Sequence, residues 1–179
     1  VGRNGAGKST TLKSILKLVH MDKGSVDCFG QDLKEYEGGI KQRIGYTGGA
    51  VNFYKKKKIS NLIEITKSFY ENWDDVVCGE YMKLFSLDAD KTPSELSEGM
   101  KVKLSLVLAL SHGAELLILD EPFHGMDSIC KQKCLNLIEK YALQPDKSLI
   151  FVTHYRSEIP TCVSHVYELN APLALNQQA

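Results

Sequence analysis

The stretch GRNGAGKS, residues 2–9, decides the fold of this chain. It fits the pattern G-x-x-x-x-G-K-[ST] without a mismatch. Glycines at these spacings let the backbone curl so that successive N–H groups point toward the oxygens of a bound phosphate. We expect Lys8 to neutralise the β- and γ-phosphates of a nucleotide, and Ser9 to offer its hydroxyl to Mg²⁺.

A helix should follow this loop and add its positive N-terminal end to the phosphate site. Leu12, Ile15, Leu16 and Val19 recur with helical spacing, which predicts one apolar face. Residues 22–24, DKG, are typical of a turn. The helix is therefore expected to stop near residue 24.

The segment ELLILDEP, residues 115–122, supplies a second element. Its apolar run suits a strand buried on both faces of a parallel sheet, and ligands bind at the carboxyl end of such strands. We expect Asp120 to hold Mg²⁺, directly or through water. Glu121 would polarise a water for attack on the γ-phosphate. Taken alone, the two acids could equally be solvated residues at a strand end.

The run LIFVTH, residues 149–154, is another candidate buried strand, and it ends in a histidine. It is the next apolar strand after the acidic pair, so His154 could reach the same γ-phosphate. A lone histidine at a strand end is otherwise a structural residue.

The segment LSEGM, residues 96–100, precedes a strongly apolar stretch. Ser97 is predicted to cap a helix that continues to about His112. A serine hydroxyl and the backbone N–H of Gly99 at a helix start would form a second anion site. The alternative is an ordinary cap on a buried helix.

The composition limits the classes of function. The chain has 179 residues, which corresponds to about one domain. Lys plus Arg and Asp plus Glu both number 22, which argues against a nucleic-acid binder held by bulk positive charge. No apolar run approaches the ~20 residues that a membrane-spanning helix needs, and no secretory leader is apparent. The five scattered cysteines are expected to be reduced thiols. Because the chain begins with Val1 and the loop follows at once, we expect a chain truncated at its N-terminus, inside a domain.

In this order, the segments resemble the motifs of the ATP-binding cassette (ABC) ATPases. Residues 2–10 resemble the Walker A motif, 96–100 the signature and 116–120 Walker B. Glu121 is similar to the catalytic glutamate of that family, GMD at 125–127 to the D-loop and His154 to the switch histidine. The resemblance assigns catalysis to Lys8, Glu121 and His154, and Mg²⁺ to Ser9 and Asp120. It assigns the following residues to ATP: Gly2, Asn4, Gly5, Ala6, Gly7, Lys8, Ser9, Thr10, Ser97, Gly99 and Asp127.

The resemblance implies an α/β fold of the P-loop NTPase kind. A RecA-like core with a parallel sheet would comprise residues 1–52 and 113–179, and a helical lobe with the signature would comprise 53–112. It further implies an ATPase that powers a transporter from the cytoplasmic face of the cell membrane. Its partners would be a separate transmembrane permease chain and a second ATPase subunit, identical or not, with ATP between Walker A of one subunit and the signature of the other.

Finer features narrow this resemblance. Residues 69–74, 99–101 and 109–112 are similar to exporter ATPase subunits of Gram-positive bacteria that pair with ABC-2 type membrane proteins. Two alternatives stay open. One is a soluble ABC ATPase without a transporter, and the other is a truncated nucleotide-binding remnant without turnover.

The sequence also departs from the family pattern. Gly49 stands where the glutamine of the Q-loop is usual, and a glycine has no side chain to ligate Mg²⁺. Glu98 and Met100 replace the usual signature glycine and glutamine. We expect Glu98 to point outward, because a carboxylate beside a phosphate would lower its affinity.

Two other segments allow two interpretations each. The run Lys55–Lys58 is either a solvated loop or a contact for anionic lipid headgroups or an acidic coupling segment. Trp73, with Phe69 and Tyr70, is expected in the core of the helical lobe, with a groove for the membrane partner as the alternative.

Overall fold

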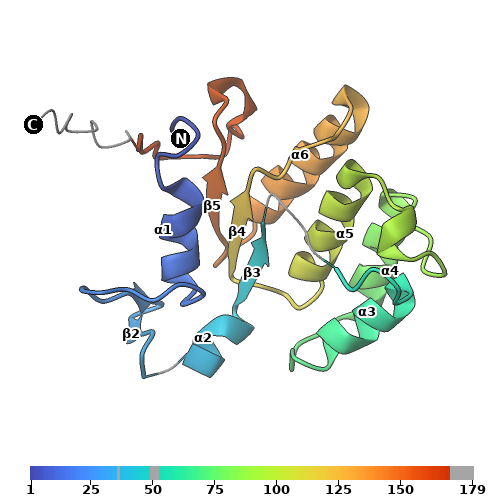
Figure 1. The fold of residues 1–179 in the computed structure, drawn as a ribbon, viewed down its shortest axis with the longest axis horizontal. Coiled ribbons are helices and arrows are strands. Elements are labelled where there is room, and N and C mark those ends of the chain that lie inside the picture. Colours follow the sequence, from blue (N-terminus) through green and yellow to red (C-terminus); the bar gives the residue numbers. More distant parts are fainter. Residues whose placement is uncertain (36, 49–52, 170–179) are drawn as a thin grey trace, which may run out of the picture.

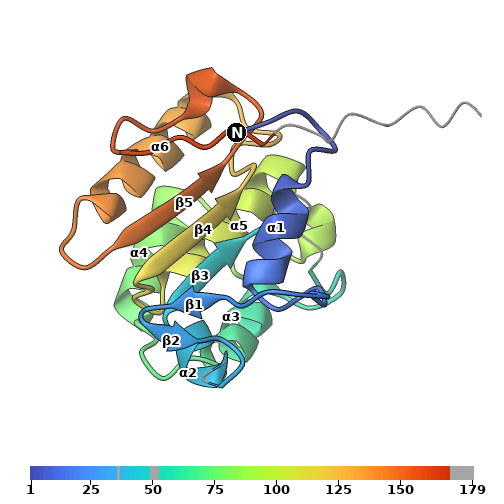
Figure 2. The same cartoon turned by 90° about the vertical axis from the view of Figure 1, so that its left-hand side faces the viewer.

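The computed structural model describes residues 1–35, 37–48 and 53–169 (Figure 1). Its centre is a parallel sheet with strand order β3-β4-β5: Ile44–Thr47, Leu116–Asp120 and Ser148–Val152. In the register, Tyr46 lies beside Ile118, which lies beside Ile150. Figure 2 shows the three arrows pointing the same way, so their carboxyl ends share one edge. The predicted strands and their parallel arrangement are therefore confirmed, and β4 is buried as expected. The expected burial of β5 was wrong: Ser148 is exposed and the other four residues are only partly buried, because β5 has a strand on one side only among the described residues.

Alternation along the strands divides the apolar interior into two clusters. Ile44, Leu116 and Ile118 face helix α1, Lys8–Ile15, with its buried Leu12. Leu117 and Leu119 face the opposite side, where they pack with α5, Glu98–Leu110, and α6, Ser128–Ala142. All five residues of β4 are buried because helices cover both faces of this strand.

The remaining elements surround these layers (Figure 1). Helices α3, Ile59–Lys67, and α4, Asp75–Leu84, lie beyond α5. Asp74 caps α4 by accepting hydrogen bonds from the backbone N–H groups of Val76 and Val77. Short elements complete the described chain: β1 Asp27–Cys28, β2 Gln31–Asp32, α2 Glu37–Gln42, and the 3₁₀ turns η1 Pro93–Glu95 and η2 Arg156–Glu158. No helix in the described ranges is long and apolar enough to cross a membrane.

Helix α1 ends earlier than its apolar pattern predicts. Lys17 adopts a left-handed conformation with φ 56°, and the N–H of Leu18 reaches back to the carbonyl of Lys13. The N–H of Lys17 bonds to the carbonyl of Ser14, so the end has the Schellman pattern. Val19 lies beyond this stop and is 40% exposed. Its predicted place on the buried face was wrong, because the helix no longer continues at that position.

Helix α5 agrees closely with the sequence prediction. The Ser97 hydroxyl accepts a hydrogen bond from the N–H of Met100 at 3.2 Å, which confirms Ser97 as the cap. The helix ends at Leu110, two residues before the expected end near His112. Val102 and Leu104 are among its buried residues, and Met100 packs against the same cluster.

The predicted aromatic core of residues 69–73 is correct only in part. Trp73 packs against the cluster beneath α5, and Tyr70 stacks on buried His112 with 3.7 Å between ring centroids. Phe69 is 68% exposed, so its expected burial was wrong. It follows the end of α3, where the chain turns toward solvent.

Two surface segments also bear on the predictions. Lys55–Lys58 is exposed and directly precedes α3, and Lys58 forms an ion pair with Asp90 at 2.9 Å. Near the end of the described residues, the backbone of Val1 donates a hydrogen bond to the carbonyl of Tyr167 and accepts one from the N–H of Leu169. Gly49 lies outside the described residues.

Candidate active site

The loop of residues 2–9 has the conformation that its glycines predict. Gly5 and Gly7 have φ 82° and 88°, a region that favours glycine. Lys8, the first residue of α1, is 8% exposed and donates to the carbonyls of Gly2 (2.7 Å) and Arg3 (3.0 Å). Its ammonium group therefore lies against the backbone of the loop, where the motif predicts a phosphate.

Asp120 closes β4 at the carboxyl edge of the sheet. It is 4% exposed, and its Oδ1 atom has no hydrogen-bond partner among the described residues. Strand alternation directs Asp120 to the same face as Ile118, the face that α1 covers. Burial raises the pKa of neighbouring Tyr46, and the Asp120 charge adds to this rise.

The residues at this edge fit Mg²⁺. A buried carboxylate oxygen without a partner is costly, and Mg²⁺ binds oxygen ligands of this kind. Ser9, a partly exposed residue, follows Lys8 on α1, the helix that covers this face of the sheet, and its hydroxyl is a second oxygen ligand of the kind that Mg²⁺ binds. Asp120 and Ser9 are the residues that would hold the metal.

Glu121 and His154 come together from neighbouring strand ends. The His154 Nδ1 atom lies 2.8 Å from Oε2 and 2.9 Å from Oε1 of Glu121. The side chain of His154 is 32% exposed and that of Glu121 is 23% exposed, so the pair remains open to solvent and to a ligand. The N–H of Glu121 also donates to the carbonyl of Val152 at 2.9 Å. A carboxylate and an imidazole are therefore held in contact beside the buried Asp120.

The backbone of Glu121 is itself unusual. Its φ of 54° lies in the left-handed region, which costs a non-glycine residue roughly 1–2 kcal/mol. Such strain persists where the surroundings over-determine a position, and it is frequent at functional sites. Here it turns the carboxylate away from the strand direction and toward His154.

The other predicted nucleotide contacts lie at the start of α5 and α6. Gly99 packs so tightly on Gly125 that a Cβ atom at residue 99 would lie 2.4 Å from the Gly125 carbonyl oxygen. The Asp127 side chain caps α6 by accepting from the N–H of Cys130 at 2.8 Å, and this hydrogen bond lowers the pKa of Asp127. Glu98 points outward, as predicted: its side chain is 61% exposed and pairs with Lys101 at 2.7 Å.

The structure brings the predicted residues together in two groups. Lys8 and Ser9 lie on α1, on one face of the sheet, while Ser97 and Gly99 lie at the start of α5, on the other. Figure 1 shows the sheet between the two helices. The two predicted anion sites of one chain are therefore separated by the sheet.

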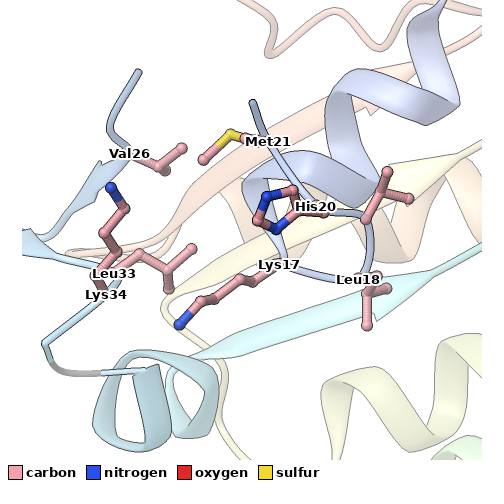
Figure 3. Close-up of a pocket in the computed structure, with 8 residues that line it drawn as sticks. Lys17, Leu18, His20, Met21, Val26, Leu33 and Lys34 are labelled. Atoms are coloured by element: carbon pink, nitrogen blue, oxygen red, sulfur yellow. The ribbon is translucent and has the colours of Figure 1, made fainter. Parts of the chain in front are cut away.

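A cavity of about 330 Å³ lies elsewhere, between the end of α1 and the β1–β2 hairpin (Figure 3). Leu18, Val26 and Leu33 line it together with Lys17 and Lys34. The Lys17 ammonium pairs with Glu37 at 2.6 Å, outside the predicted motifs. None of the predicted site residues lines this cavity.

Sequence reasoning missed three residues behind His154. Glu158 accepts from the Thr153 hydroxyl and from the Lys131 ammonium, each at 2.6 Å. Lys131 and Glu158 are 27 residues apart, and no local pattern links them. The only sequence feature that could have indicated a role for Glu158 is its position shortly after His154, on the same segment.

Residues 1–124 match the ABC transporter family. The chain belongs to that family. Its relatives include the ABC transporter ATP-binding protein YtrB of Bacillus subtilis, 31% identical over 159 residues that cover 89% of this chain and 54% of YtrB. The bacitracin transport ATP-binding protein BcrA of Bacillus licheniformis is 32% identical over 93% of this chain and 55% of BcrA.

The fold of this ABC family member is also that of solved cassettes. The dimeric structure of the bacterial ABC transporter cassette MJ0796 matches with a TM-score of 0.80 and 22% identity, over 95% of this chain and 79% of that one. An ATP-binding subunit of an ABC transporter matches with a TM-score of 0.76 and 23% identity, over 88% and 67%. The expected α/β P-loop NTPase fold is thereby confirmed. The chain spans about half the length of YtrB and BcrA.

Proposed function

We propose that this chain is the ATP-binding and ATP-hydrolysing part of an ABC transporter. The contact between Glu121 and His154, made beside a phosphate loop with an inward-facing Lys8, carries the proposal. Its relatives YtrB and BcrA are named as transporter ATP-binding proteins, which supports the same function. The similarity of residues 69–74, 99–101 and 109–112 to exporter subunits favours export of the cargo.

In the proposed reaction, Lys8 binds the β- and γ-phosphates and the loop N–H groups orient them. Glu121 accepts a proton from a water as the water oxygen bonds to the γ-phosphorus and the bond to the β-phosphate oxygen breaks, which releases ADP and phosphate. His154 contacts the γ-phosphate and, through Nδ1, orients the Glu121 carboxylate. Mg²⁺ held by Ser9 and Asp120 would neutralise phosphate charge.

The separation of the two anion sites supports a dimer. Because the sheet lies between α1 and α5, Ser97 and Gly99 do not reach the phosphate loop of their own chain. We infer that they complete the ATP site of a second ATPase subunit, with Asp127 at the same interface. The anion contacts at residue 97 would come from the serine O–H, since its oxygen already accepts from Met100.

The domain organisation and location follow from the same proposal. Residues 1–52 and 113–179 would form the RecA-like core, and 53–112 the helical lobe. The assembled protein would sit on the cytoplasmic face of the membrane, bound to a separate permease chain.

The test is MgATP turnover by the chain, paired with Glu121→Gln. We expect the variant to bind ATP normally and to lose turnover by about 100-fold or more, the usual contribution of a general base. Glu115→Gln, at the opposite end of the same strand, is the matched control and should retain turnover.

Two results would contradict the proposal. If Glu121→Gln hydrolyses ATP at the rate of the parent chain, Glu121 is not the base. If the parent chain binds ATP tightly without turnover, the hydrolytic part of the proposal fails and only nucleotide binding remains.

A further inference from the structure

The segment that carries His154 is anchored by a second carboxylate. Thr153 directly follows β5, is fully buried and uses its hydroxyl twice. The hydroxyl donates to Glu158 Oε2 at 2.6 Å and accepts from the N–H of Tyr155 at 3.1 Å. The hydroxyl oxygen of Thr153 therefore links the two neighbours of His154, Thr153 and Tyr155, and ties both of them to Glu158.

The Glu158 carboxylate extends this anchor to a helix. Its Oε1 atom accepts from Lys131 Nζ at 2.6 Å, and its side chain is only 12% exposed. Burial alone would raise the pKa of Glu158, but the hydrogen bonds from Lys131 and Thr153 lower it overall. The carboxylate thus remains charged at neutral pH and is able to hold both partners at once.

Lys131 lies one turn inside α6, the helix that Asp127 caps. The N–H of Lys131 donates to the carbonyl of Asp127 at 2.9 Å. Its ammonium group also lies 5.3 Å from the centroid of the Phe123 ring, in the segment that follows Glu121. If the first turn of α6 moves, the carboxylate of Glu158 therefore transmits the movement from Lys131 to the segment that carries His154.

We propose that Glu158 is a positioning residue that fixes His154 against Glu121 and links this pair to the start of α6. The proposal rests on the proposed function, because it acts through the same site. Thr153 and Lys131 are its two attachments. No contact of Glu158 with nucleotide is required.

The first test is kinetic and uses Glu158→Gln. A misplaced His154 should lower kcat by about tenfold, whereas the affinity for ATP should stay unchanged because the phosphate loop is untouched. In a His154→Ala background, Glu158→Gln should cause no further loss. Thr153→Val, which removes the donated hydroxyl, should act in the same direction.

The matched control is Glu168→Gln. Glu168 forms an exposed ion pair with Arg156 at 2.7 Å, on the same segment but without a link to Thr153 or α6. Its loss should leave kcat unchanged. An equal loss of turnover from Glu158→Gln in the parent and His154→Ala backgrounds would show independent effects and overturn the proposal.

The second test needs no turnover. In the NMR spectrum of ¹³C-labelled histidine, Glu158→Gln should move the ring signal of His154, assigned by its absence in His154→Gln. The signal of buried His112 should stay in place. An unmoved His154 signal contradicts the proposal, whereas a moved signal in a chain without turnover contradicts only the proposed hydrolysis.

Discussion

At the scale of single residues, Lys8 lies in the loop where the sequence motif predicts it. The motif predicts a lysine that binds phosphate, and the structure holds its ammonium group on the carbonyls of Gly2 and Arg3. Those carbonyls keep the charge inside the loop before any phosphate arrives. Lys8 thus orders the loop as well as supplying the charge.

We predict that Lys8→Ala lowers ATP affinity by about 100-fold. A charge-assisted hydrogen bond contributes about 1.5–3 kcal/mol, and each 1.4 kcal/mol is tenfold in affinity. Titration with a fluorescent ATP analogue measures the change. Lys13→Ala, which removes an exposed lysine from the same helix, should bind as the parent does. Equal weakening by both variants would show a general charge effect instead.

At the scale of elements, the start of α5 depends on its close contact with residues 125 and 126. Gly99 has the Gly125 carbonyl oxygen where a side chain would begin, and the Met126 Cα lies 3.5 Å from the same point. The signature helix and the segment before α6 therefore pack backbone to backbone. Only glycine at residue 99 allows this approach.

We predict that Gly99→Ala destabilises the fold by about 1–3 kcal/mol, the usual cost of overpacking. Gly79→Ala on α4 is the matched control, because a Cβ there meets no atom within 4 Å. In that helix the same change should stabilise the protein by about 0.5–1 kcal/mol. Urea unfolding of both variants gives the two signs. Equal effects would mean that the contact with Gly125 is not a constraint.

The elements also show how far the sequence predicts this structure. Asp120, Glu121 and His154 were predicted at the carboxyl edge because apolar runs locate buried strands and polar residues mark their ends. The early end of α1, followed by the left-handed Lys17, was missed, since a left-handed lysine has no sequence signal of its own. The contact of Glu158 with Lys131 was missed because it depends on how η2 packs against α6.

At the scale of the whole molecule, His112 joins the two sides of the fold. It is 2% exposed, with Nε2 3.2 Å from the carbonyl of Ile44 on β3 and Nδ1 3.4 Å from that of Leu108 on α5. Burial lowers the pKa of His112 below the usual value of 6.5, against these hydrogen bonds, which raise it. The folded protein therefore binds a proton here less readily than the unfolded chain.

This difference makes stability depend on pH. Well above pH 6.5 His112 is neutral in both the folded and the unfolded state, so it contributes no pH dependence there. As the pH falls below that value the unfolded chain takes up the proton first, so His112 reduces stability. We predict a loss of up to about 1.4 kcal/mol per pH unit, the limit for one proton.

Urea unfolding between pH 7.5 and about pH 5 measures this slope. His112→Phe keeps an aromatic ring against Tyr70 and removes the titrating group, so its profile should be flatter. His165→Gln, an exposed site, should retain the slope of the parent. A parent profile as flat as that of His112→Phe would contradict the prediction.

The left-handed backbone of Glu121 has a consequence for the history of such proteins. Glycine would adopt φ 54° without strain, so Glu121→Gly would relax the backbone while removing the carboxylate that contacts His154. Selection for thermal stability alone would therefore favour loss of the carboxylate. Under the proposed function, selection for hydrolysis opposes this relaxation, and a chain released from that selection is expected to lose this residue early.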